Sequence, residues 1–475
     1  GACWSGRAKR LGRELFQDSG VADLLNREFI PVKVDADSAP KRARYLRQVA
    51  QLLNTPLRYP LIVIFTPDGE PLAALAPETR SELMRLLEAT SKSYRTNPEE
   101  THRQADALTR LWEQRWFRPA TPIEVDSLAE PSLPELPKTA EDWIGGQPDL
   151  LNELEWLLAQ SHSDLEARSL LVTFLHHLRQ SVLWDPKSGG FYALAEGVDY
   201  ELKPIGGKLL TEHARLLRLY ALASRHDRTL APIAHEIAQA MRTIFWNERP
   251  AGFYHSTRPP LTVRALSDAP QGLHTDRTVV AESNALAVLA LVDYWRVFGH
   301  ASSHGNWAFK SAQRTLETLR AMQTPEGHLY HTSRRQTAEW LRDLSLTLLA
   351  GCAVETLQPD PSRRRWLAQL SRMLVFYMDP TGGYYDTPRS KQWGGWSLTP
   401  VRMSVDDALP ADNVLVAQAL LAYSRTSGDP ALLEQAMQTL RVVAGDHDPQ
   451  QCGQSFSFFA LRHAIRHATT TTGTH

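Results

Sequence analysis

Cysteine is scarce in this chain, and its three cysteines lie far apart. Cys3, Cys352 and Cys452 form no CxxC pair and no metal-ligand spacing among the 475 residues. So few thiols exclude a disulfide-built scaffold, and three separate thiols are the simplest interpretation, with one bridge left open. From the sequence we expect no metal and no cofactor.

Strong charge and long apolar runs are also lacking. The formal net charge is −1 at pH 7, which gives no long-range attraction to nucleic acid or an anionic membrane. No run of about 18 apolar residues is present, so we predict no transmembrane segment. The sequence has no P-loop and no dinucleotide-binding GxGxxG after a strand. The abrupt start at Gly1 favours an extracytoplasmic location, because a leader would lie there, with the cytoplasm as the alternative.

Residues 1–118 have an α/β pattern. The segment "IPVKVDAD" at 30–37 alternates as a strand does, and residues 59–75 predict a β-hairpin around a Pro-Asp-Gly turn. Three stretches have the helical spacing of apolar residues: 9–29, 39–54 and 78–95.

The rest of the chain predicts a linker and an all-helical domain. Residues 119–142 are rich in proline and predict an extended linker. Residues 143–475 contain about eleven amphipathic helical segments. Glycine-aromatic loops recur between alternate helices: "DPKSGGFY" at 185–192, "AGFYH" at 251–255, "EGHLYH" at 326–331 and "DPTGGYYD" at 379–386. This repeat predicts a closed toroid of helical hairpins, whose loop aromatics either stack on a ligand or plug the mouth.

The order of the motifs resembles the DUF255 family, which includes YyaL and spermatogenesis-associated protein 20. The matching segments are "ELFQD", "VKVD" and "YPLIVIFTPDG" in the first part, then "GGFY", "GGKLLTEHARLL", "DRTVVAESNALAVLAL", "GGYYD" and "DDALPADN". The resemblance covers nearly the whole chain. It implies a thioredoxin-like domain joined to an (α/α)6 barrel similar to those of sugar epimerases and six-hairpin glycosidases. The family's strand before the CxxC is absent from this sequence, so the first domain is expected to be truncated.

The chain departs from the family at the redox site. Counted back from "ELFQD", the two family cysteines fall on Ser5 and Ala8, or on Cys3 and Gly6 with a short insertion. Either register lacks the second cysteine. Thiol–disulfide exchange by such a site needs an attacking and a resolving thiol, so dithiol oxidoreductase activity is excluded. The resemblance also implies that the Tyr59–Pro60 peptide bond is cis.

The barrel is altered as well. Where the family has a "PHFEK" motif, this chain has Pro204-Ile205-Gly206-Gly207-Lys208, without the histidine and the glutamate. Chemistry in the barrel would then need other proton-transferring groups near the mouth. The weak catalytic candidates are Glu212, His213, Glu282 and Asp343.

Ligand-binding candidates are the polar and aromatic side chains of the loops and helix starts. These are Trp184, Tyr192, His255, Asn284, His331, Tyr385, Asp386, Trp393, Trp396, Asp406 and Asn413. The alternatives are core packing for Trp184, a satisfied core or surface role for the histidines, and capping or interhelical hydrogen bonds for Asp343 and Asn413. The two tryptophans of "KQWGGWSLTPVRM" suit a sugar face or a protein interface equally.

These patterns predict a catalytically degenerate, non-redox protein. The first hypothesis is a barrel that binds a carbohydrate-like or other polar ligand. The second is a scaffold or accessory subunit, a pseudoenzyme that engages a protein partner through its thioredoxin-like face and Trp-rich loop. The third is a sugar epimerase, isomerase or glycosidase. A pocket lined with carboxylates and aromatics would favour ligand binding, and a plugged mouth beside an exposed apolar patch would favour the scaffold.

Overall fold

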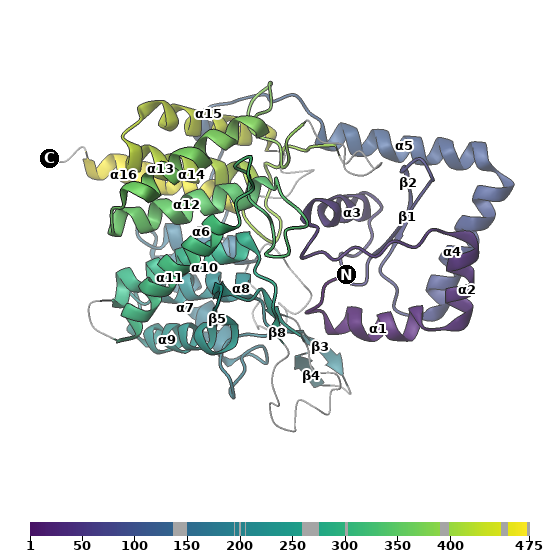
Figure 1. The fold of residues 1–475 in the computed structure, drawn as a ribbon, viewed down its shortest axis with the longest axis horizontal. Helices are drawn as coiled ribbons and strands as arrows, with labels where there is room; N and C mark the ends of the chain where they lie inside the picture. Colours follow the sequence, from purple (N-terminus) through teal and green to yellow (C-terminus); the bar gives the residue numbers. More distant parts are fainter. Residues whose placement is uncertain are drawn as a thin grey trace.

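The computed structural model places a small module against one end of a helical ring (Figure 1). We call residues 1–116 the first module. The described residues are 1–135, 150–193, 195–198, 201–204, 206–258, 275–299, 303–389, 399–447 and 455–472. The Trp-rich loop with Trp393 and Trp396 lies outside them.

The first module combines helices with one β-hairpin. Its elements are α1 (Gly6–Phe16), α2 (Ser19–Glu28), α3 (Pro40–Leu52), β1 (Ile62–Phe65), β2 (Pro71–Leu75), α4 (Arg80–Thr96) and α5 (Pro98–Trp116). The expected helix at 9–29 is two helices, because Asp18 accepts a hydrogen bond from the Val21 N–H and begins α2. Ser5, one of the two positions where the ungapped register places a family cysteine, caps α1 by accepting from the Ala8 N–H. The Tyr59–Pro60 peptide bond is cis.

The hairpin prediction is confirmed, and the strand predicted at 30–37 is wrong. Strands β1 and β2 pair antiparallel around the expected turn. Residues 30–35 pair with no described strand, and Ile30 and Val32 are 91% and 70% exposed. A strand needs a neighbour to satisfy its backbone groups. Here the second half of the segment is held by other contacts: the Gly1 amino group donates to the Val34 carbonyl at 2.8 Å, and the Ala36 N–H donates to the Gly1 carbonyl at 2.8 Å.

The described part of the ring contains eleven α-helices. They are α6 (Leu150–Gln160), α7 (Leu165–Gln180), α8 (Leu210–Ala223), α9 (Ala231–Ala240), α10 (Ala281–Phe298), α11 (Ser303–Ala321), α12 (Leu341–Leu357), α13 (Pro361–Met373), α14 (Asp412–Ser427), α15 (Pro430–Asp446) and α16 (Phe456–Thr472). The even-numbered helices form the inner wall, each packing on the next, and α16 closes the ring on α6. Inner helices such as α12 are buried on nearly every face, as expected of helices surrounded by others.

Short two-stranded ribbons lie in the loops between the helices of the ring. They pair β3 (Ala195–Val198) with β4 (Glu201–Pro204), β5 (Trp246–Glu248) with β6 (Ala251–Phe253), and β7 (Ser256–Thr257) with β8 (Thr275–Asp276). The chain between the two parts also packs on the ring. Val125 is buried in the ring's core, and Arg462 of α16 donates to its carbonyl at 3.1 Å. The described beginning of the predicted linker is therefore anchored.

The inner helices hold the repeated loops by the same kind of hydrogen bond, from a loop backbone N–H to a side chain near the helix start. His213, Asn284 and Asn413 lie near the starts of α8, α10 and α14, and each accepts a hydrogen bond from a loop backbone N–H. The donors are the N–H groups of Phe191, Phe253 and Tyr384, at 3.0, 2.8 and 2.7 Å.

A second repeat fixes the end of each loop. The first N–H of α8, α10 and α12 donates to the carbonyl of His255, His331 and Asp386 respectively. These three residues are equivalent positions of the glycine-aromatic loops. The fold therefore places their side chains together at the end of the ring where the inner helices begin, which we call the mouth.

Candidate functional site

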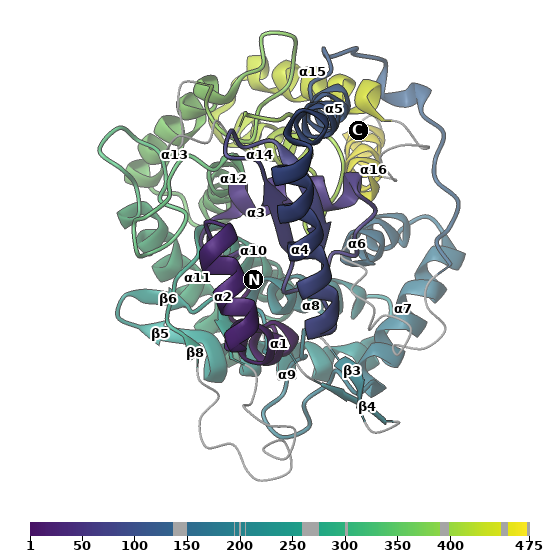
Figure 2. The same ribbon diagram turned by 90° about the vertical axis from the view of Figure 1, so that its right-hand side faces the viewer.

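The first module lies across the mouth (Figure 2). Buried Val49 and Trp112 of the module pack with Val401, Met403 and Val405 of the ring. Around this apolar contact the mouth has two polar halves. We call Lys41, Arg44, Arg342, Asp386, Asp407 and Asp412 the Lys41 network, and Glu212, His255, Glu282, His331 and Asp343 the histidine half.

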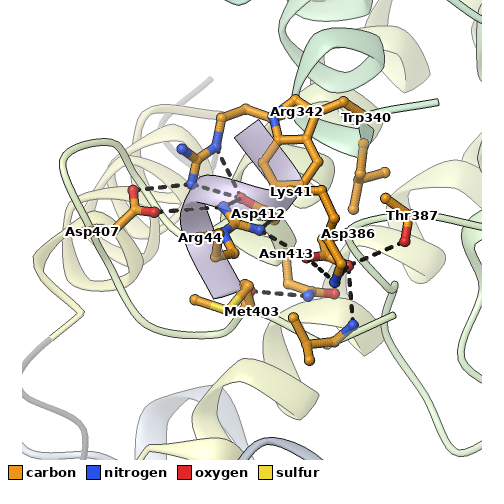
Figure 3. A network of polar contacts seen from close by, with 12 residues as sticks. Lys41, Arg44, Trp340, Arg342, Asp386, Thr387, Met403, Asp407, Asp412 and Asn413 are labelled. Atoms are coloured by element: carbon orange, nitrogen blue, oxygen red, sulfur yellow. Dashed lines mark hydrogen bonds and ion pairs between the residues drawn. The ribbon is translucent and has the colours of Figure 1, made fainter. Parts of the chain in front are cut away.

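In the Lys41 network, two cations of α3 enter the mouth and meet ring carboxylates (Figure 3). Lys41 Nζ donates to both oxygens of Asp386, each at 2.9 Å, and to the Thr399 carbonyl at 2.9 Å. Arg44 makes a bidentate contact with Asp412 at 2.6 and 2.9 Å. Paired, planar contacts of this kind are among the strongest polar interactions in proteins.

The ring supplies the third cation. Arg342 Nε donates to Asp412 at 2.9 Å and its Nη2 to Asp407 at 3.1 Å (Figure 3). The Arg44 guanidinium also lies 4.4 Å from the centre of the Trp340 ring, within cation–π range. Burial disfavours its charge, yet the carboxylate of Asp412 raises the pKa of Arg44. Three cations balance three carboxylates, so the charges of this half of the mouth are paired within the chain, although the buried Nε of Arg44 has no hydrogen-bond partner.

His331 anchors the histidine half. Its Nδ1 lies 2.8 and 3.1 Å from the two oxygens of Asp343, and its Nε2 donates to the Asp37 carbonyl of the first module at 3.0 Å. Burial opposes the charged imidazole, but the Asp343 carboxylate raises the pKa of His331 to about 9. The side chain therefore bridges the ring and the module.

His255 makes the second contact to the same module residue. Its Nδ1 is 2.9 Å from the Ser283 hydroxyl, and its Nε2 is 3.5 Å from Asp37 Oδ1. Trp4 of the former redox segment donates to the same Asp37 oxygen at 3.2 Å.

Cys3 lies beside these groups and is not activated. Its Sγ is 3.3 Å from Asp276 Oδ2 and 3.4 Å from the Ser256 hydroxyl. Burial raises the pKa of this thiol to about 12. The thiolate is the reactive form of cysteine, and the raised pKa keeps Cys3 in the unreactive thiol form.

Two glutamates complete this half, and both are partly buried. Glu282 Oε2 accepts from Trp340 Nε1 at 3.3 Å. The carboxyl group of Glu212 makes no hydrogen bond or ion pair within the described residues. Burial raises its pKa to about 7, against the opposing charges of Arg215 and His255.

Several predicted site residues make hydrogen bonds that hold the ring together. The Asn284 amide donates to the carbonyls of Phe253 and Val280, and the Asn413 amide to those of Tyr384 and Met403. This is the capping or interhelical role given as the alternative for Asn413. Asp343 likewise accepts from the Glu282 N–H at 3.0 Å.

The other predicted residues also lie against protein groups. Burial lowers the pKa of His213 to about 3, which leaves the ring neutral as an acceptor. Asp406 accepts from the Ala411 and Ser457 N–H groups. Trp184 packs on Phe191, and the Tyr192 hydroxyl donates to Asp185. Tyr385 lies beneath the Arg389 guanidinium at 5.5 Å.

Sequence reasoning missed the residues of the first module and their ring partner. These are Asp37, Lys41, Arg44 and Arg342. One signal was present, because Lys41, Arg44 and Gln48 follow helical spacing and place polar groups on one face of α3. All three are buried. Nothing local in the sequence indicates that this face meets carboxylates more than three hundred residues away.

The fold and the site define a non-CxxC thioredoxin-like module seated on an (α/α)6 barrel. Residues 1–113 match the thioredoxin-like DsbH family model, described as "Protein of unknown function, DUF255". The chain thus carries a DUF255 domain followed by a mostly helical region with the fold of (α/α)6-barrel enzymes.

The solved structure of a D-mannose isomerase supports the barrel assignment. This isomerase has 10% identity and a TM-score of 0.51, and the match covers 67% of this chain and 87% of that one. A sugar epimerase from a ruminal bacterium has 12% identity and a TM-score of 0.49, with the same coverages. At such identities the likeness shows the fold alone. No curated protein sequence matches the chain. None of the helices in the described ranges combines the length and hydropathy needed to span a bilayer.

Proposed function

We propose that this is a non-redox protein whose barrel mouth binds a small, carbohydrate-like polar ligand between the histidine half and the first module. The carrying observation is Glu212, a partly buried carboxyl group that no described residue contacts through a hydrogen bond or ion pair. Its side chain keeps some contact with solvent, so water can bond to the carboxyl group in the free protein. A ligand hydroxyl at this position would replace that water with a direct hydrogen bond to a partly desolvated carboxyl group.

The neighbouring groups suit a polyhydroxylated ligand. Glu212, His255 and Glu282 come from the starts of adjacent inner helices and the loop between them, and they combine acceptors with a donor. Sugar hydroxyls both donate and accept, so a mixed set of this kind recognises them. The fold shared with a D-mannose isomerase supports the choice of ligand class as an analogy only.

The cysteines support the non-redox part of the proposal, because the chain has no pair for dithiol exchange. The described residues contain two cysteines, both free, Cys3 and Cys352, and the sequence has no CxxC pair. Exchange needs an attacking and a resolving thiol within reach of each other. The first module is then left with the role of covering and lining the mouth.

A thermal-shift screen against mono- and oligosaccharides tests the proposal. Binding restricted to the native state stabilises it by about 2.7 kcal/mol at a hundredfold excess over Kd. We expect one sugar class to raise the melting temperature and Glu212→Gln to abolish that shift. Glu166→Gln, an exposed glutamate in the first turn of outer helix α7, is the matched control. No shift across the panel contradicts the proposal.

A scaffold or accessory-subunit role is the second candidate. The Lys41 network favours it, because half of the mouth is already occupied by the chain's own cations. Exposed Val375, Phe376 and Met378 form an apolar segment on the ring for a protein partner. A partner that co-purifies with the wild type and with Glu212→Gln, but is lost with Phe376→Asp, would support this role over ligand binding.

A further inference from the structure

We propose that Glu282, His331 and Asp343 form a binding site for one divalent transition-metal ion, with Mn²⁺ and Zn²⁺ as the matching probes. This inference goes beyond the proposed function and does not depend on it. It also departs from the expectation of no metal, which considered only ligands close together in sequence.

The three side chains converge from neighbouring elements. Glu282 lies in the first turn of α10, Asp343 in the first turn of α12, and His331 ends the loop that bonds to the Ala281 N–H. One ligand atom from each residue lies within 4.8 Å of the other two. His331 and Asp343 are fully buried, and Glu282 is partly buried. Buried, convergent donors on rigid elements are what a metal site requires.

The donor separations fit a shared ion. Two donors at right angles, each about 2.1 Å from a metal, lie about 3 Å apart. His331 Nδ1 is 2.8 Å from Asp343 Oδ2 and 3.1 Å from Oδ1. A small movement of these side chains would admit an ion in place of the proton they share.

Each of the three side chains also makes a second hydrogen bond that orients it, as metal ligands do. His331 Nε2 donates to the Asp37 carbonyl at 3.0 Å, which directs Nδ1 toward the cluster. Glu282 Oε2 accepts from Trp340 Nε1 at 3.3 Å. Asp343 Oδ1 accepts from the Glu282 N–H at 3.0 Å. One oxygen of each carboxylate and one imidazole nitrogen remain as inner ligands.

The local charge and ligand chemistry favour a divalent cation. Two carboxylates and one imidazole bring two negative charges, which a divalent ion neutralises. Carboxylate oxygens suit Mn²⁺ and Mg²⁺, while imidazole suits Zn²⁺ and other later metals. The mixed set therefore matches Mn²⁺ or Zn²⁺ better than Mg²⁺. A proton on His331 Nδ1 is the competing occupant, and it requires no metal.

Titration calorimetry on the full chain, freed of metal by a chelator, separates these occupants. We expect Mn²⁺ or Zn²⁺ to bind with one ion per chain, and Asp343→Asn to weaken that binding by at least about 100-fold. Asp276→Asn is the matched control, because Asp276 is a carboxylate at the same interface that contacts Cys3 and Arg334 outside the cluster. It should retain wild-type affinity.

Asp343 also bonds the α10 backbone, so Glu282→Gln is the second variant. Circular dichroism checks that both variants keep the fold. Loss of metal binding in Glu282→Gln, with the control unchanged, supports the site even if Asp343→Asn does not fold. The proposal is overturned if the wild type binds neither ion at millimolar concentration. It is also overturned if a folded Glu282→Gln binds as tightly as the wild type.

Discussion

Glu212 provides a sharp test of the electrostatics at the mouth. Its pKa is raised by burial from 4.5 to about 7, so the folded protein holds this proton more tightly than the unfolded chain does. Below pH 4.5 both states are protonated and the group has no effect. As the pH rises toward 7, the unfolded state ionises first, and the folded state loses stability relative to it. Above pH 7 that loss is complete.

The size of the loss follows from the pKa difference. A change from 4.5 to about 7 corresponds to about 3 kcal/mol at 1.36 kcal/mol per pKa unit. The side chain keeps some contact with solvent, which screens part of this penalty. We therefore expect about 1–2 kcal/mol. Glu212→Gln removes the charge and keeps the shape, so it should be more stable than the wild type by this amount in alkaline buffer.

Chemical denaturation at about pH 5 and about pH 8 measures the effect. The stability difference between Glu212→Gln and the wild type should grow from small at the lower pH to about 1–2 kcal/mol at the higher. Glu166→Gln, which replaces an exposed carboxylate, should show no such pH dependence. A difference that is equal at both pH values, or largest in acid, would refute the reasoning about Glu212.

Three further predictions concern the interface and the ring. Arg44→Ala should destabilise the protein by about 2–3 kcal/mol in denaturation experiments, because it removes the bidentate partner of buried Asp412 and leaves Arg342 to balance that carboxylate; a loss below about 1 kcal/mol would show that water replaces the guanidinium. Lys41→Met should lower the melting temperature much more than Arg47→Met does, because the Arg47 guanidinium lies at the edge of the network, 4.0 Å from Asp407. Equal melting temperatures of the two variants would contradict this. Asn284→Ala should cost about 1–3 kcal/mol by leaving the Phe253 N–H without its acceptor. Asn247→Ala, in strand β5, removes only an exposed hydrogen bond to the Pro250 carbonyl and should cost little; equal losses would argue against the loop-holding role.

The helices and the ring could be predicted because their signals are local. Apolar periodicity placed the inner helices, and the recurrent glycine-aromatic loops indicated helical hairpins closed into a toroid. The six-hairpin form came from the family resemblance. The strand at 30–37 could not be predicted correctly, since alternation records which residues are apolar and says nothing of whether a neighbouring strand exists. Exposed Val32 shows the consequence.

The composition of the mouth was predictable only in part. His255, His331 and Asp386 occupy equivalent loop positions, so the repeat itself brings them to one end. Lys41 meets Asp386 across 345 residues of sequence, and no local pattern records such a pairing. The proposed metal ligands are likewise separated in the chain and become neighbours only when α10 and α12 pack side by side.

The segment that lacks the CxxC pair packs against the ring. Adding the two cysteines tests whether this packing would keep them inactive. Ser5 is buried, and the Trp4 carbonyl accepts a hydrogen bond from Gly207 of the ring. Cys3 in the same segment has a pKa of about 12 because it is buried. A helix start lowers the pKa of a thiol, but burial against the ring works in the opposite direction. We therefore expect the double variant Ser5→Cys/Ala8→Cys to show no disulfide reductase activity in an insulin-reduction assay, despite its complete CxxC. The same variant with Arg44→Ala added has a weakened contact between the first module and the ring, and its reductase activity is compared with that of the double variant. Activity in the double variant alone would mean that the segment is accessible and that docking does not silence it.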